Sequence, residues 1–282
     1  MSDVCECVSM ADTQQVALEI LKTLSRFCEE EGIRYFLIFG TLIGAIRHKG
    51  FIPWDDDVDI MMPRPDHERF VQRFLARRGE FPFLKLFTPN INPDYPYMIS
   101  RVSDDRYRIV MDNEKPYGMG VFVDIYPYDG LGDCQKEALK LVKKSDRLSS
   151  LCFQASRLHL EKGITKSLWK KLIKFPVFVF CKVIGKEFFM NKLRQMEGAF
   201  PYDSSQYVGN VVWASEGDVC VYERQLFEDS VLVEFEGGLY RAPVGYDRYL
   251  RHIYGNYMEL PPEKERAPRH GYYVIKNPGL NV

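Results

Sequence analysis

Three aspartates, Asp55, Asp57 and Asp59, occur at alternate positions in residues 53–63, a segment that ends in the apolar run Ile60-Met61-Met62. Alternate side chains of an extended strand lie on the same face, so we expect these carboxylates to lie together. Like charges this close are costly unless a cation neutralises them or a proton is shared. Oxygen ligands favour a hard ion, Mg²⁺ or Mn²⁺, over zinc. The pattern therefore predicts a divalent-metal site.

The alternative for this acidic run is a solvated loop without a bound ion, which is the commoner fate of such runs. Trp54 and the apolar residues that follow Asp59 argue against a wholly exposed loop, because these side chains are expected to be buried.

A glycine turn, Phe39-Gly40-Thr41, precedes the acidic segment. It follows an apolar run that is predicted to be a strand, and it opens a predicted helix. Glycine lets backbone amides approach a phosphate, and a helix N-terminus favours the negative charge of that phosphate. Such a turn is common by itself. A phosphate turn placed shortly before an Asp-x-Asp strand, however, is typical of nucleotidyltransferase folds.

The elements that would position these residues follow from periodicity and breakers. The predicted helices are residues 12–31, 41–48, 66–78 and 246–254, with a helical, basic region from 134 to about 198. The predicted strands are residues 33–39, 53–63, 121–126, 208–212 and 231–235, with further short strands within 81–110. This order predicts an α+β protein with a mixed-sheet core and helices, followed by a mostly helical C-terminal half. The phosphate turn and the Asp-x-Asp segment make that core resemble a nucleotidyltransferase-like sheet.

The size of 282 residues fits one compact unit. Within it we expect a catalytic core at 12–130 and a mainly helical donor- and acceptor-binding region at 131–282, packed on that core.

Three stretches of the sequence resemble the LicD family. The most specific is FGTLIGAIRHKGFIPWDDDVDIMMPRPD at residues 39–66; VFVDIYPYDG at 121–130 and YLRHIYGNYMELPPEKE at 249–265 support it. That family includes bacterial phosphorylcholine transferases and resembles the fukutin-type phosphotransferases. The resemblance implies transfer of phosphocholine, or a related substituted phosphate, from CDP-choline or a similar CDP-linked donor. The acceptor would be a hydroxyl of a glycan or lipid-linked glycan, either teichoic acid or lipopolysaccharide, and CMP would be released.

The resemblance also assigns roles to individual residues. Asp57 and Asp59 match the metal pair of the family, and Asp124 matches the third acid of the fold, so the three are expected to be both catalytic and metal-binding with Mg²⁺ or Mn²⁺. The carboxylate of Asp124 could also accept the proton of the attacking hydroxyl. As an alternative, Asp124 could only cap a turn near Pro127.

The donor phosphates would be held by Gly40 and Thr41, and Arg47 and His48 would add positive charge. Either of the last two could instead be an ordinary surface residue.

Aromatic faces are the usual partners of a quaternary ammonium. Trp54, Tyr126, Tyr128 and Trp213 lie near the motif segments, which makes them candidates to bind choline. Ordinary core packing is the alternative for each of them.

A basic, aromatic-rich segment spans residues 162–194, with nine Lys or Arg residues and a single acid, Glu187. Such a helical stretch can lie on an anionic membrane surface. It can equally be a helix packed on the core with a solvated lysine face.

The net charge and the cysteines limit the possible partners of the protein and its location in the cell. A net charge of −1 provides no global positive field to attract nucleic acid. The N-terminal segment lacks the features of a secretory signal, and the seven scattered cysteines are expected to be reduced thiols. We therefore expect a cytoplasmic protein, or one held peripherally at the inner face of the membrane.

Two other functions fit parts of the pattern. A nucleotidyltransferase would move a nucleotide monophosphate and release pyrophosphate or a nucleotidylated acceptor. A non-catalytic nucleotide-binding regulator would bind without turnover, although the intact acids argue against it.

Overall fold

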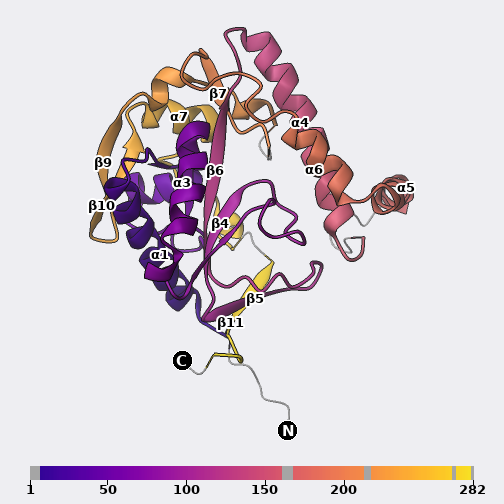
Figure 1. Cartoon of the computed structure of the whole chain (residues 1–282), viewed down its shortest axis with the longest axis horizontal. Helices are drawn as coiled ribbons and strands as arrows, with labels where there is room; N and C mark the ends of the chain where they lie inside the picture. The colour runs from indigo at the N-terminus through magenta and orange to yellow at the C-terminus, as the bar shows by residue number, and fades with distance from the viewer. Residues whose placement is uncertain (1–6, 161–167, 213–216, 269–270, 281–282) are drawn as a thin grey trace.

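The computed structural model describes residues 7–160, 168–212, 217–268 and 271–280 of the chain (Figure 1). The first helix, α1 (Met10–Glu30), starts two residues before the predicted position. Ser9 is its N-cap: the Ser9 hydroxyl oxygen accepts a hydrogen bond from the Asp12 amide at 3.1 Å. The buried stripe of α1 includes Ile20, Leu21 and Leu24, as the periodicity predicts.

A mixed sheet forms the centre of the molecule, which confirms the predicted α+β class. Its strands are β1 (Phe36–Leu37), β2 (Asp59–Pro63), β6 (Phe122–Gly130), β4 (Ser100–Asp104) and β3 (Leu84–Phe87), in that spatial order. Strands β2 and β6 are parallel, and the other neighbours are antiparallel. The far end of β6 also pairs with β7 (Tyr207–Gly209), which in turn pairs with β8 (Tyr222–Glu223).

The register of this sheet aligns three charged residues. Asp59 of β2 is opposite Asp124 of β6, and Asp124 is opposite Arg101 of β4. All three are buried, with at most 8% of each residue exposed. A row of charges across three adjacent strands thus lies in the interior of the fold.

The acidic run is a loop in its first part, which corrects the predicted strand at 53–63. Strand β2 begins only at Asp59, and the Asp55 amide donates to the carbonyl of Ile52 at 2.9 Å, which closes a turn. Aspartate and proline disfavour extended strands and favour turns. The carboxylates still meet, but through the loop and not through strand alternation.

The predicted helix at 41–48 forms as two pieces, α2 (Phe39–Ile43) and a π-helical turn (Gly44–His48). It begins at Phe39, which has a positive φ of 47°. That backbone conformation is rare outside glycine and is often found at functional sites.

Helix α3 (Arg64–Ala76) packs beside α1, and Phe27 of α1 contacts Phe70 and Phe74 of α3 edge-on. At the start of α3, the Arg64 guanidinium donates two hydrogen bonds of 2.8 Å to the fully buried carboxylate of Asp129 in β6. This ion pair ties the helix to the end of the strand.

The rest of the chain adds a helical group and two small sheets. Its helices are α4 (Gln135–Ser156), α5 (Leu168–Ile184), α6 (Lys186–Arg194) and α7 (Tyr246–Tyr254). The strands are β9 (Ser230–Phe235) with β10 (Gly238–Pro243), and β11 (Tyr272–Lys276) with β5 (Tyr107–Met111). Helices α4, α5 and α6 lie together at one side, with α5 outermost (Figure 1). Among the described residues, no helix is both long and apolar enough to cross a membrane.

Candidate active site

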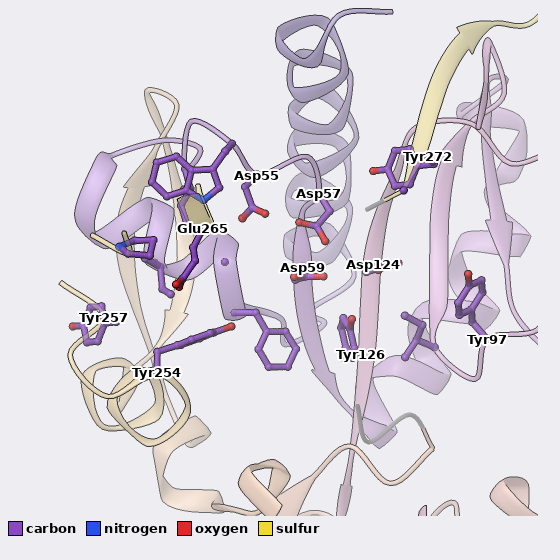
Figure 2. A pocket seen from close by; sticks show the side chains of 18 of the residues that line it. Asp55, Asp57, Asp59, Tyr97, Asp124, Tyr126, Tyr254, Tyr257, Glu265 and Tyr272 are labelled. Atoms are coloured by element: carbon purple, nitrogen blue, oxygen red, sulfur yellow. The ribbon is translucent and has the colours of Figure 1, made fainter. Parts of the chain in front are cut away.

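A cleft of about 920 Å³ opens over the aligned charges. Asp57, Asp59 and Asp124, the three predicted acids, all line it, and Asp55 joins them. Figure 2 shows Asp55, Asp57 and Asp59 near its centre, with Asp124 on the neighbouring strand. The sequence prediction that these carboxylates lie on one side of the fold therefore agrees with the structure.

Asp59 has an unbalanced charge. Only 6% of the residue is exposed, and its Oδ1 has no hydrogen-bond partner among the described residues. Burial, together with the nearby carboxylates of Asp57, Asp124 and Asp55, raises the pKa of Asp59 well above its usual value. A buried carboxylate oxygen without a donor and surrounded by like charge is the environment that a hard cation would stabilise.

Two sets of carboxylates could hold such a cation. Asp57 and Asp59 both face the cleft, while Asp55, Asp56 and Asp57 place one oxygen each within 4.8 Å of one another. Asp56 does not line the cleft, and its carbonyl accepts a hydrogen bond from Tyr272. The set with Asp57 and Asp59 fits better because it includes the unsatisfied oxygen.

The third acid, Asp124, forms an ion pair that sequence analysis missed. Arg101 Nε donates to Asp124 Oδ1 at 2.5 Å, and Arg101 Nη2 donates to Oδ2 at 3.2 Å. The Arg101 guanidinium also lies over the rings of Tyr97 and Phe122, at 4.2 Å and 4.1 Å from their centroids. An arginine in a predicted strand region, close to the apolar residues Ile99 and Val102, was the available signal, but only the strand register identifies its partner. Arg101 therefore fixes the orientation of Asp124.

Gly40 and Thr41, two residues of the predicted phosphate turn, have different roles in the structure. Gly40 lines the cleft, and a Cβ atom there would lie 2.3 Å from Oδ2 of Asp55, so only glycine leaves room for that carboxylate. The Thr41 side chain is buried and does not line the cleft. Its hydroxyl oxygen accepts a hydrogen bond from the Asp59 amide at 2.8 Å. Thr41 thus positions the first residue of β2.

Arg47 lines the cleft, whereas His48 does not. Arg47 Nη1 donates to the carbonyl oxygens of Tyr257 and Glu259 at 2.6 Å and 3.0 Å, and Nε donates to Nε2 of His48 at 2.9 Å. Burial and the neighbouring Arg47 lower the pKa of His48, in agreement with a neutral ring that accepts this bond. The Arg47 guanidinium therefore anchors the C-terminal segment.

The four aromatic residues predicted to bind choline do not all line the cleft. Trp54 and Tyr126 line the cleft. Tyr128 does not: its ring is 1% exposed, is stacked on Tyr222 at 5.6 Å and is hydrogen-bonded to Tyr249. Trp213 lies outside the described residues.

The structure adds four tyrosines to the lining of the cleft: Tyr97, Tyr254, Tyr257 and Tyr272. Tyr97 and Tyr272 belong to segments distant from the acidic run, and no local spacing connects them with it. Tyr254 and Tyr257 lie in the stretch 249–265 that resembles the LicD family, which was the available signal.

A mixed sheet with a glycine turn and clustered aspartates on its central strands defines a transferase of the nucleotidyltransferase type. Residues 32–147 match the family model described as "LicD/FKTN/FKRP, nucleotidyltransferase domain". The chain is also 33% identical over 267 residues to the lipopolysaccharide cholinephosphotransferase LicD of Haemophilus influenzae, covering 93% of this chain and 96% of that protein. The chain belongs to the LicD family and is a transferase.

Shorter similarities involve two uncharacterized rickettsial proteins. One from Rickettsia typhi is 39% identical over 54 residues, 19% of this chain and 18% of that protein. One from Rickettsia prowazekii is 40% identical over 59 residues, 21% of this chain and 22% of that protein.

Asp59→Asn should make the metal-free protein more stable, because it removes a buried charge that three other carboxylates repel. We expect a melting temperature about 2–4 °C higher, the shift that about 1 kcal/mol produces in a protein of this size. Millimolar Mg²⁺ should raise the melting temperature of the unaltered protein but not that of Asp59→Asn. Asp112→Asn, which changes an exposed carboxylate of the same cleft, serves as the control and should behave like the unaltered protein. A metal-free Asp59→Asn protein that melts earlier would contradict this account.

Proposed function

We propose that this protein transfers phosphocholine, or a related substituted phosphate, from a CDP-linked donor to a hydroxyl of a cell-envelope glycan, lipopolysaccharide or teichoic acid, and releases CMP. The buried, unsatisfied Asp59 oxygen in an acidic cleft is the observation that carries the proposal. Similarity along almost the whole length to a lipopolysaccharide cholinephosphotransferase supports the transferred group and the acceptor class.

The residues present fit a divalent cation. Asp57, Asp59 and Asp124 would hold Mg²⁺ or Mn²⁺, which when bound neutralises the negative charge of the donor diphosphate. Around that position, the missing side chain of Gly40 leaves room for the Asp55 carboxylate, and Arg101 fixes the plane of Asp124.

Asp124 has two proposed roles, as a cation ligand and as acceptor of the proton of the attacking hydroxyl. A carboxylate offers about four lone-pair positions on its two oxygens. Arg101 occupies one position on each oxygen, so a position on each remains for a cation or a proton. Both roles are compatible with the ion pair.

A nucleotidyl transfer would use the same cleft and the same cation, so the products must distinguish the two reactions. Phosphocholine transfer from CDP-choline gives CMP and a choline-phosphorylated glycan. Nucleotidyl transfer gives pyrophosphate from a triphosphate, or a nucleotidylated acceptor. A non-catalytic regulator gives neither product.

With Mg²⁺, CDP-choline and purified lipopolysaccharide or teichoic acid, the protein should release CMP in step with choline incorporation. Asp57→Asn should reduce the rate at least about a hundredfold while the fold remains intact, because charge stabilisation of a transfer step is worth that much or more. Excess chelator should stop turnover. Circular dichroism is the control for folding. Turnover unaffected by the chelator would argue against metal dependence, and pyrophosphate release without CMP would favour nucleotidyl transfer.

We also propose that α5 and α6 contact an anionic membrane surface, which would bring the cleft close to a lipid-linked acceptor. Large apolar side chains on these helices are exposed to 58% at Phe175, 54% at Phe180, 79% at Val183 and 49% at Phe188. The only acid within residues 168–194 is Glu187, among several lysines. A helix packed on the core with a lysine face in solvent would cover these rings, so their exposure among the described residues favours the membrane interpretation.

Combined Phe175→Ser, Phe180→Ser and Val183→Ser substitutions should greatly reduce sedimentation of the protein with phosphatidylglycerol vesicles, because apolar insertion and lysine attraction act together. Turnover of a short soluble acceptor should survive. Leu232→Ser with Leu239→Ser, which removes two equally exposed leucines from the β9–β10 hairpin, is the matched control. Equal loss of vesicle binding in both variants, or no loss in either, would argue against a specific contact through α5.

A further inference from the structure

We infer that the side of the cleft formed by Trp54, Tyr254, Tyr257 and Glu265 holds the quaternary ammonium of the donor, while the opposite side holds its nucleotide. This assignment rests on the proposed function and specifies how the same cleft orients the donor. Figure 2 shows Tyr254, Tyr257 and Glu265 on one side of the central aspartates, and Tyr97 and Tyr272 on the other.

The proposed ammonium side is held in place by contacts from two parts of the chain. Arg47 bonds the carbonyls of Tyr257 and Glu259, as described above. The hydroxyl of Tyr257 donates to Asp247 Oδ1 at 2.8 Å. Arg266 Nε donates to the carbonyl of Pro261 at 2.8 Å, and its guanidinium lies 5.7 Å from the centroid of the Trp54 ring. The segment after α7 is therefore fixed against the glycine turn and the acidic loop before any ligand binds.

The chemistry of this side suits a cation that has no N–H groups. A quaternary ammonium cannot be held by hydrogen bonds, and it is recognised by aromatic faces and by a nearby carboxylate charge. Three aromatic rings line this side, and two of them already attract guanidinium groups: Arg266 lies over Trp54, and Arg251 lies 5.9 Å from the centroid of the Tyr257 ring. Both rings still line the cleft.

Glu265 supplies a charge that other groups do not neutralise. Its side chain makes no hydrogen bond or ion pair with any described residue. The nearest fixed cation of this side that also lines the cleft, Arg47, is committed to backbone carbonyls and to His48. A positive ligand group would therefore gain an unshared carboxylate here.

The opposite side differs, because its buried carboxylates are already paired. Glu114 forms an ion pair with Arg157 at 2.8 Å, and its Oε1 accepts a hydrogen bond from the Tyr97 hydroxyl at 2.6 Å, although its Oε2 has no hydrogen-bond partner among the described residues. Asp124 is bound by Arg101. Guanidinium groups lie on both sides, but Arg101 and Arg157 pair with the acids of the opposite side. On the proposed ammonium side, Arg47 and Arg266 donate to backbone carbonyls and leave the Glu265 carboxylate without a partner among the described residues. The two sides thus discriminate between the two ends of a CDP-linked donor.

The test compares the binding of CDP-choline and of CMP by calorimetry, with Mg²⁺ present throughout. Glu265→Gln and Tyr254→Leu should each weaken CDP-choline binding about tenfold, the scale of a lost desolvated cation–aromatic or charge contact, and leave CMP binding within about twofold. Both variants should also lose any preference for CDP-choline over CDP-ethanolamine. Glu263→Gln, which alters an exposed carboxylate that lies in the same short helical turn as Glu265 but does not line the cleft, is the matched control and should leave both affinities unchanged.

Equal weakening of CDP-choline and CMP by Glu265→Gln would overturn the inference and place the nucleotide on this side. Unchanged affinities in properly folded variants would overturn it as well. If the unaltered protein binds CMP but not CDP-choline, the proposed function fails together with this subsite. If the unaltered protein binds CDP-choline but the variants do not weaken that binding, only the subsite fails and the proposed function stands.

Discussion

The register of β2, β6 and β4 is the constraint on which the rest of the structure depends, because it places Asp59, Asp124 and Arg101 in one buried row. Arg101 balances only one of the two carboxylates, so Asp59 keeps an unsatisfied oxygen next to like charge. Such an arrangement costs free energy of folding and persists because the surrounding core holds it. The packing of α1 and α3 and the buried Arg64–Asp129 pair supply that support.

The unbalanced charge of Asp59 lies between two sides of the cleft that differ in their charged groups. The central aspartates suit a cation. The carboxylates on one side of them are paired with arginines, whereas the Glu265 carboxylate on the other side has no partner among the described residues. On one side Arg157 and Arg101 pair with buried acids; on the other, three aromatic residues and the exposed Glu265 line the cleft. Arg47, a residue of the glycine-turn region, holds the second side in place through backbone carbonyls. The resulting cleft can orient a donor whose two ends carry different charge.

Local sequence patterns predicted the parts of the fold that depend on neighbours in the chain. The α+β class and most helices followed from periodicity and composition. Asp55, Asp57 and Asp59 do gather, but through a loop and not through the strand alternation from which their proximity was predicted. Tertiary contacts decided the rest, because the Arg101 partner of Asp124 has no signal in residue spacing. The Ser9 cap and the turn before β2 had local signals that the prediction did not use, namely the Ser-x-x-Asp spacing and the aspartates that follow Pro53. The tyrosines that line the cleft come from several segments of the chain. Tyr128 lies in a motif segment but is buried in the core, and its position in that motif does not distinguish it from the tyrosines of the cleft.

The location of a bound Mn²⁺ ion tests the central claim most directly. Crystals grown with Mn²⁺ should show an anomalous peak about 2.1 Å from one oxygen each of Asp57 and Asp59, the usual distance for a hard six-coordinate cation. A peak on Asp55, Asp56 and Asp57 that leaves Asp59 without a contact would contradict the account. Full activity with no ion bound at the row of buried charges would contradict it as well.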